Sequence, residues 1–226
     1  MSGKEEAPPA SVWFERAPLY RKPYRGASSW DVVVVGGGIT GMSAAYHLAL
    51  RGRRVAVLEQ YGIGEGSTGL SGGFLAAASS WDLRTLIKLR GEVGGKAIYD
   101  SIASAIGEIE TVTRREGISC GFRRDGTFYF AAEDSHFGVL KEEFETLTRH
   151  GYRAELYLKG DLRIPVAGAH GALRTFSDAS MDPVGELLDA IIEAKQIAQK
   201  RGGYLTVVAS IGGTDGDPQD LNLQTQ

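Results

Sequence analysis

The feature that most constrains this sequence is a run of four valines that leads directly into three consecutive glycines. The run spans Asp31–Val35, and after its first residue it is apolar and β-branched. This pattern is typical of a parallel strand that is buried on both faces. The next residues read GGGITG, so the pattern G-x-G-x-x-G is met at Gly36, Gly38 and Gly41. The first glycine permits a tight turn, the second lets the backbone approach a pyrophosphate, and the third lets helix and strand pack closely. The pattern therefore predicts the start of a nucleotide-binding strand–helix–strand unit.

The residues after this turn complete the unit. Apolar residues recur at helical spacing over Ile39–Arg51, and Gly52 is placed to end that helix. A second apolar run, Val55–Leu58, predicts a second buried strand, and Glu59 follows it directly. A carboxylate at this point can accept hydrogen bonds from a ribose hydroxyl, and it disfavours a 2′-phosphate. We therefore expect a dinucleotide whose phosphates lie at the N-terminus of the helix.

A second stretch rich in glycine, serine and threonine indicates which dinucleotide to expect. Residues 60–75 read QYGIGEGSTGLSGGFL. A simple NAD-binding unit does not need such a loop at this point. An extended FAD does, because its pyrophosphate and isoalloxazine ring need further backbone and hydroxyl donors. The loop therefore favours FAD.

At these residues the sequence resembles the D-amino-acid oxidase superfamily, which includes glycine oxidase, sarcosine oxidase and the γ-glutamylputrescine oxidase-like enzymes. The resemblance is carried by VVVVGGGITGMSAAYHLALRG and VAVLEQYGIGEGSTGLSGGFL. It continues more loosely through GFRRDGTFYFA and FSDASMDPVGELLDAI, and it covers about residues 12–203. One departure is Ser71, where many relatives have a larger polar residue before the glycine pair.

The resemblance implies a role for each part of the site. It places Glu59 on the adenosine ribose, Ser67 and Thr68 on the pyrophosphate side, and the GGF segment near the flavin ring. The expected cofactor-binding residues are Gly36, Gly38, Ile39, Thr40, Gly41, Glu59, Gln60, Ser67, Thr68, Gly72, Gly73 and Phe74. No catalytic residue can be named. Tyr129 with Arg123 and Arg124 could line a pocket, although ordinary positions on a strand explain them more simply.

The implied fold class is α/β, with a Rossmann-like FAD-binding βαβ domain and part of a second, α+β substrate domain. The implied function is an FAD-dependent oxidoreductase that oxidises the C–N bond of a small amine or amino acid by hydride transfer to flavin. Two alternatives stay open, a non-catalytic FAD-binding fragment and an NAD-dependent Rossmann enzyme.

The domain boundaries follow from composition and from this resemblance. We expect an aromatic and proline-rich leader at 1–30 that lies on the body of the protein, an FAD-binding domain at 31–118 and 172–211, a partial substrate domain at 119–171, and a disordered tail at 212–226. Because enzymes of this family are longer and the match fades after Gly203, we expect the chain to lack a C-terminal part.

Periodicity and turn residues predict the remaining elements. These are helices at 83–89, 97–115, 136–150 and 183–200, the last with Asp182 as its N-cap. Strands are expected at 154–158, 172–176 and 205–210, and a hairpin with strands 120–123 and 127–131.

Composition excludes several other classes of protein. A net charge of −3, from 25 basic and 28 acidic residues, gives no basic face for nucleic acid or a membrane surface. The single cysteine, Cys120, is expected to be a buried small hydrophobe rather than a reactive thiol. The four histidines show no spacing typical of a metal site. No run approaches the length of a membrane span, and a cytoplasmic location is expected.

Overall fold

The computed structural model describes residues 11–15, 29–60, 62–78, 80–161, 166, 168–184 and 204–209. The chain divides into two units. The first comprises residues 1–72, 115–120 and 182–226, and the second comprises residues 73–114 and 121–181.

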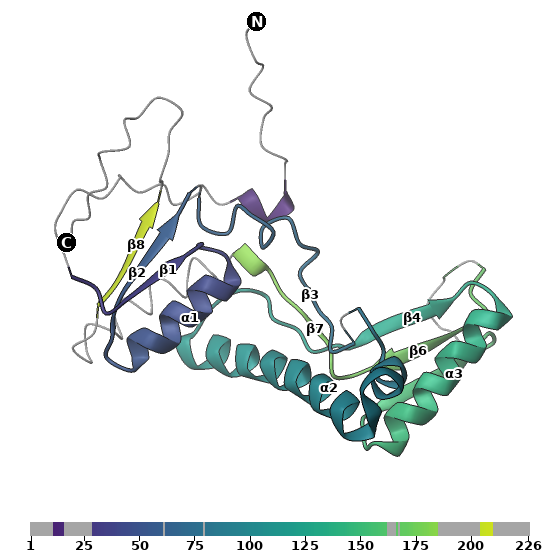
Figure 1. Cartoon of the computed structure of the whole chain (residues 1–226). Helices are drawn as coiled ribbons and strands as arrows, with labels where there is room; N and C mark the ends of the chain where they lie inside the picture. Colours follow the sequence, from purple (N-terminus) through teal and green to yellow (C-terminus); the bar gives the residue numbers. More distant parts are fainter. Residues whose placement is uncertain are drawn as a thin grey trace, which may run out of the picture. The chain divides into compact units, whose positions relative to one another are not determined.

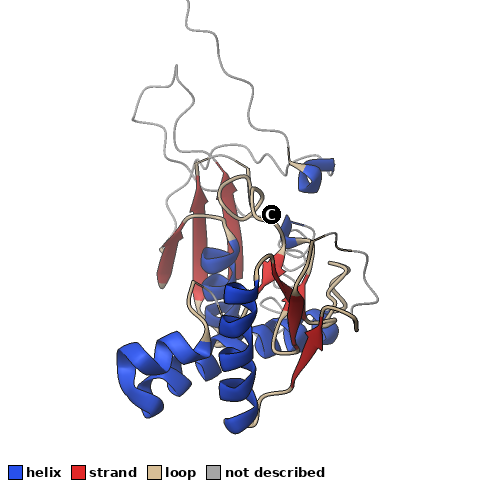
Figure 2. Cartoon of the chain, turned by 90° about the vertical axis from the view of Figure 1, so that its right-hand side faces the viewer, coloured by secondary structure: helices blue, strands red, loops and turns tan. Residues whose placement is uncertain are grey.

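The first unit contains a parallel three-stranded sheet in the order β1-β2-β8, and a helix lies across one face of it (Figures 1 and 2). Its elements are the 3-10 helix η1 (Val12–Glu15), β1 (Val32–Val35), α1 (Ile39–Leu50), β2 (Arg54–Glu59) and β8 (Tyr204–Ala209). Helix α1 connects β1 to β2, ends at a C-cap on Arg51, and is followed by Gly52 with a φ of 75°. The strand–helix–strand unit predicted from the sequence is therefore present.

Strand β1 is not buried on both faces, so that part of the prediction is wrong. Val33 and Val35 share one face and are 51% and 80% exposed, whereas Val34 faces α1 and is half-buried. Strand β2 lies between β1 and β8, and its Val55 and Val57 are fully buried. An uninterrupted apolar run predicts a strand, but it does not tell an edge position from a central one.

The second unit contains an antiparallel sheet in the order β4-β6-β5, with α3 packed on one face (Figure 1). Its elements are β3 (Phe74–Leu75), β4 (Thr127–Ala131), α3 (Asp134–Arg149), β5 (Ala154–Leu158), β6 (Gly171–Thr175), β7 (Ala179–Ser180) and most of α2 (Leu83–Glu116). Strands β3 and β7 form a separate antiparallel ladder. The core of this unit includes Leu83, Tyr99, Leu147 and Leu173.

Helix α2 is two helices that meet at Gly91, whose φ is 71° and ψ is 169°. Gly95 lies so close to the first helix that a Cβ there would be 2.5 Å from the backbone nitrogen of Ile87. The break falls between the two predicted helices, but the second helix begins several residues earlier than predicted. Glycines such as Gly94 and Gly95 disfavour an isolated helix, yet here a glycine permits the close approach of the two parts.

The predicted hairpin around Arg124–Gly126 is wrong. Thr127–Ala131 forms β4 as expected, but its partner is β6. Arg123 instead exchanges two backbone hydrogen bonds of 2.8 Å with Ser180 in β7. The predicted turn is also absent: Gly126 has a φ of 78° and lies against the Thr175 carbonyl, but residues 124–126 run without a turn from the Arg123 bridge into β4.

The other predicted elements agree with the structure within a few residues where it describes them. The Asp182 carboxylate accepts the Val184 N–H at 2.9 Å, which confirms the predicted N-cap. The body of the predicted helix at 183–200, the tail at 212–226 and most of the leader lie outside the described residues. Among the residues that are described, no helix combines the length and apolar character needed to cross a bilayer.

Candidate cofactor site

The turn from β1 into α1 depends on two glycines. Gly36 has a φ of 104°, a conformation that favours glycine, and its N–H donates to the Leu58 carbonyl at 2.7 Å. A Cβ on Gly41 would lie 2.0 Å from the Gly36 carbonyl oxygen and 3.3 Å from a methyl group of Val34. The tight turn and the close packing expected of these two positions are both present.

The N-terminus of α1 has no capping side chain of its own. Its N-cap is Gly38, and its first turn contains no acidic residue. The Thr68 hydroxyl, from the Gly/Ser loop, accepts the Ile39 N–H at 3.1 Å, and a Cβ on Gly38 would be 3.1 Å from that hydroxyl oxygen. A neutral hydroxyl does not offset the positive end of the helix dipole, so this end of α1 suits an anion such as a phosphate.

Glu59 lies at the carboxyl end of β2 and is half-buried. Its Oε2 accepts the N–H of Gly37, and a Cβ on Gly37 would be only 3.0 Å from that oxygen. Gly37 is buried and was not among the residues predicted for the site. The middle position of the three consecutive glycines could have revealed it, but the G-x-G-x-x-G pattern treats this position as variable.

The Gly/Ser loop, residues 62–72, returns to this turn. The Gly64 N–H donates to the Gly37 carbonyl at 3.1 Å, and the Glu65 carboxylate accepts the Gly62 N–H at 2.8 Å. The Gly69 N–H donates to the Gly64 carbonyl at 2.7 Å, which closes the loop on itself. The loop is therefore folded against the start of α1.

The structure brings together part of the predicted set in the first unit. Six of the predicted residues lie in the turn from β1 into α1 or contact it. They are Gly36, Gly38, Ile39, Gly41, Glu59 and Thr68. Thr40, Gln60, Ser67 and Gly72 belong to the same unit and are exposed. Gly73 and Phe74 belong to the second unit, where Gly73 is buried and the Phe74 side chain is 77% exposed.

The pocket-wall candidates of the second unit have structural contacts. Tyr129 packs against the core, and burial, with the charge of Asp178 next, raises the pKa of its phenol. Arg123 pairs with Asp125, and Arg124 pairs with Glu110 at 2.8 Å. Packing and ion pairing account for these side chains.

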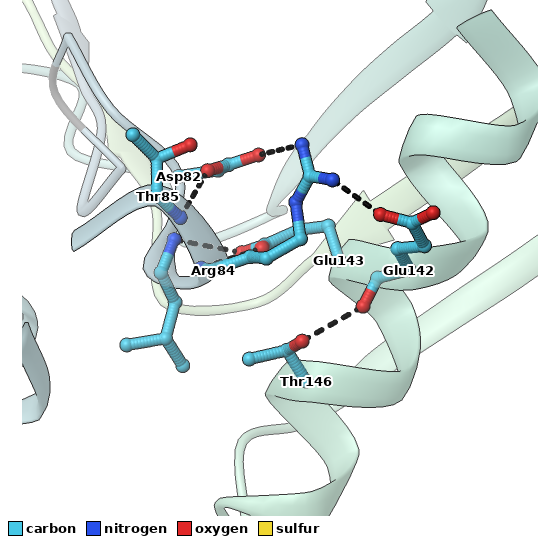
Figure 3. A network of polar contacts seen from close by, with 7 residues as sticks. Asp82, Arg84, Thr85, Glu142, Glu143 and Thr146 are labelled. Carbon is cyan, nitrogen blue, oxygen red and sulfur yellow. Dashed lines mark hydrogen bonds and ion pairs between the residues drawn. The ribbon is translucent and has the colours of Figure 1, made fainter. Parts of the chain in front are cut away.

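The N-terminus of α2, in the second unit, is capped by a buried carboxylate (Figure 3). Glu143 of α3 is 5% exposed, and its two oxygens accept the N–H groups of Leu83 at 3.0 Å and Arg84 at 2.9 Å. Asp82 accepts the Thr85 N–H at 2.8 Å, and Arg84 pairs with Glu142. Burial raises the pKa of Glu143 to about 7, with a further rise from Asp82, while the two N–H groups and the Arg84 charge oppose it.

Two further expectations concern metal and cysteine chemistry. Cys120 is buried, as expected of a small hydrophobe. Within the described ranges, no group of three or more His, Cys, Asp or Glu side chains is placed to hold a metal ion.

Comparison with known proteins gives a match that includes the β1–α1 turn and the Gly/Ser loop. A family model described as FAD dependent oxidoreductase (DAO) matches residues 31–206. The gamma-glutamylputrescine oxidoreductase of Escherichia coli K12 is 34% identical over 157 residues, which are 68% of this chain and 37% of that protein. The glycine oxidase of Geobacillus kaustophilus is 30% identical over 122 residues, which are 54% of this chain and 28% of that one.

Solved structures show the same fold. The crystal structure of glycine oxidase from Geobacillus kaustophilus superposes with a TM-score of 0.57 at 22% identity, over 79% of this chain and 46% of that one. An L-amino acid deaminase from Proteus myxofaciens gives a TM-score of 0.64 at 17% identity, over 86% of this chain and 41% of that one. The chain thus spans less than half the length of these relatives.

Proposed function

The chain belongs to the FAD dependent oxidoreductase (DAO) family, whose cofactor is FAD, and from this premise we propose that residues 31–75 hold the cofactor of an enzyme that oxidises a carbon–nitrogen bond. The substrate class is a small amine or amino acid. Support comes from the relatives, which include an oxidoreductase of gamma-glutamylputrescine and a glycine oxidase.

The observation that carries the proposal is the N-terminus of α1. It begins at a glycine, lacks an acidic residue in its first turn, and has a neutral hydroxyl as the partner of the Ile39 N–H. A side chain on Gly38 would come within 3.1 Å of that hydroxyl and narrow the approach to the backbone. These residues fit a pyrophosphate, because backbone N–H groups and the helix dipole both favour an anion there.

The residues have separate proposed roles toward FAD. Gly38 and Ile39 present backbone to the pyrophosphate, Thr68 orients its hydroxyl beside them, and Glu59 accepts hydrogen bonds from the adenosine ribose. When bound, FAD supplies the hydride acceptor for the carbon beside the substrate nitrogen. The protein orients the substrate, and the resulting imine hydrolyses in water.

Other assignments stay proposals. The GGF segment at 72–74 is proposed to approach the flavin ring, and the remaining members of the predicted set are proposed to contact the cofactor. The division into an FAD-binding domain at 31–118 and 172–211 and a partial substrate domain at 119–171 is likewise proposed, as is a cytoplasmic location.

The first test is an absorbance spectrum of the purified chain before and after incubation with FAD and removal of the excess. We expect the visible flavin bands to stay with the protein, and we expect NAD to give no retained complex under the same treatment. A folded chain that retains NAD and not FAD would overturn the proposal.

Turnover is a second and separate measurement. Glycine, sarcosine and a polyamine, added to the FAD-loaded chain, test whether this length of chain reduces the flavin. Flavin bleaching with one of them supports an oxidoreductase. Retained flavin without bleaching by any substrate supports the alternative of a non-catalytic FAD-binding chain.

A further inference from the structure

A turn near the N-terminus contacts the Gly/Ser loop through side-chain donors. The Ser11 hydroxyl donates to the Gly69 carbonyl, and the Trp13 indole N–H donates to the Ser71 carbonyl at 2.8 Å. The Trp13 backbone N–H donates to the Ser11 hydroxyl at 3.3 Å, so the turn is also held from within. Both contacts join residues 58 positions apart in the sequence and lie within the first unit.

The two contacted carbonyls lie one and three residues after Thr68. Thr68 is the residue whose hydroxyl accepts the Ile39 N–H at the start of α1. Fixing the backbone at residues 69 and 71 therefore restricts where the Thr68 hydroxyl can lie.

This part of the loop needs such support more than the part before it. Residues 62–65 are anchored by the Glu65 carboxylate and by the Gly37 carbonyl, and Gly62, Ile63 and Gly64 are buried. In the later part, Gly69 is buried and its N–H donates to the Gly64 carbonyl at 2.7 Å, but Leu70, Ser71 and Gly72 are exposed. Exposed backbone with few buried contacts opens readily, so each added hydrogen bond there has a large share in holding it.

We propose that the Ser11–Trp13 turn is a clasp that holds the Gly/Ser loop closed on the cofactor and thereby slows the release of FAD. Ser11 and Trp13 are positioning residues that act through the loop, and neither is assigned a contact with FAD. The proposal rests on FAD binding as the proposed function of the site.

The clasp predicts a kinetic effect. Opening of the loop removes the Thr68 hydroxyl from the start of α1, and a looser loop opens more often. Loss of one hydrogen bond of ordinary strength corresponds to about a threefold to tenfold change in an equilibrium. We therefore expect FAD to dissociate about threefold to tenfold faster from Trp13→Phe, which keeps an aromatic ring but lacks the N–H donor, and from Ser11→Ala.

Two variants separate the donors from their surroundings. Ser11→Thr keeps the hydroxyl and is expected to restore slow release. Val12→Ala changes a 68% exposed side chain in the same turn and is expected to release FAD at the wild-type rate. Release is followed by the rise in flavin fluorescence after dilution. Wild-type rates in both Trp13→Phe and Ser11→Ala would overturn the clasp and leave the proposed function intact.

Hydrogen–deuterium exchange of the cofactor-free chain tests the contact without FAD. We expect the amides of residues 69–72 to exchange faster in Trp13→Phe and Ser11→Ala than in wild type and Val12→Ala. Should wild type bind no FAD, the proposed function fails while this measurement still decides whether the turn holds the loop. Unchanged exchange in both donor variants would refute the contact itself.

Discussion

Each unit contains a helix whose N-terminus carries the positive end of the helix dipole. The side chains that bond the N–H groups at these two N-termini differ. At the start of α2, the buried Glu143 carboxylate takes the N–H groups of Leu83 and Arg84, and Asp82 takes that of Thr85. At the start of α1, the cap is Gly38, and the side chain that bonds the Ile39 N–H is the neutral Thr68 hydroxyl, while the Glu59 carboxylate accepts the Gly37 N–H just before the cap. Carboxylates of the protein thus take the N–H groups of the first turn of α2 and fix α2 to α3, whereas no acidic side chain lies in the first turn of α1, which suits an added anion.

Among the substitutions that test this comparison, Gly41→Ala should have the largest effect on stability and on FAD retention. The new Cβ would lie 2.0 Å from the Gly36 carbonyl oxygen, so α1 must move away from β1. We expect a loss of more than about 3 kcal/mol in unfolding free energy, measured by urea titration, and loss of FAD retention.

Gly138→Ala is the matched control for this change. Gly138 lies within helix α3, and a Cβ there meets nothing within 4 Å. The same substitution should therefore stabilise the protein by about 0.5–1 kcal/mol through helix propensity, with FAD retention unchanged. Equal behaviour of the two alanine variants would contradict the close packing assigned to Gly41.

Glu143→Gln should give the next largest effect on stability, and the size of that effect depends on pH. The folded-state pKa of about 7 lies above the ordinary 4.5, so the folded state binds more protons between these values and wild-type stability falls as pH rises through them. The fall is about 3 kcal/mol. Glutamine does not titrate, and like the protonated carboxyl it presents one carbonyl oxygen to the two N–H groups. Urea titrations from pH 4.5 to 8 should thus show similar stabilities at pH 4.5 and the glutamine variant ahead by up to about 3 kcal/mol at pH 8.

Glu142→Gln controls for charge on the same helix. Glu142 is 63% exposed and pairs with Arg84 at the surface, so its loss should change stability by less than about 1 kcal/mol. If the unfolding free energies of wild type and Glu143→Gln changed with pH in parallel, Glu143 would not titrate between pH 4.5 and 8.

The start of α1 was predictable from the sequence and the start of α2 was not, and the reason is distance along the chain. The signal of the Gly36–Gly41 turn is local, because a Cβ on Gly41 would meet the Gly36 carbonyl and Val34, only a few residues away. The Asp182 cap was predictable for the same reason. Glu143, in contrast, caps a helix that begins 60 residues earlier, and nothing in its neighbours distinguishes it from an exposed helical glutamate.

The same limit explains the errors in the strands. Gly126 has the positive φ expected of a turn glycine, but the chain makes no turn there, and the partner of Arg123 is Ser180, far along the chain. The valine run of β1 showed a strand without showing which strands flank it. The resemblance, by comparison, placed Thr68 on the pyrophosphate side, and the structure adds that its hydroxyl accepts the Ile39 N–H.

Thr68→Val should have a smaller effect, restricted to the first unit. Valine matches the shape of threonine and removes the hydroxyl beside the proposed pyrophosphate. We expect FAD to bind about tenfold more weakly, which corresponds to about 1.4 kcal/mol, and Thr68→Ser to restore most of the affinity. Fluorescence titration measures both. An unchanged dissociation constant for Thr68→Val would remove Thr68 from the site.

Asp82→Ala should give the smallest effect, and it tests whether the α2 end serves structure alone. Loss of this N-cap should lower stability by about 1 kcal/mol at pH 5. Removing Asp82 also removes a repulsion that raises the pKa of Glu143. At pH 8, where Glu143 is ionised, relief of that repulsion should offset part of the loss, so the destabilisation should be smaller than at pH 5.

Asp82→Asn separates these two contributions, because asparagine keeps an oxygen that can accept the Thr85 N–H and lacks the charge. It should be close to wild type at pH 5 and equal to or more stable than wild type at pH 8, with FAD affinity unchanged at both. Equal losses for Asp82→Ala at the two pH values would show that Asp82 and Glu143 are not coupled. A weakened FAD affinity in either variant would mean that the α2 end also supports the cofactor site, and the contrast between the two helix starts would then fail.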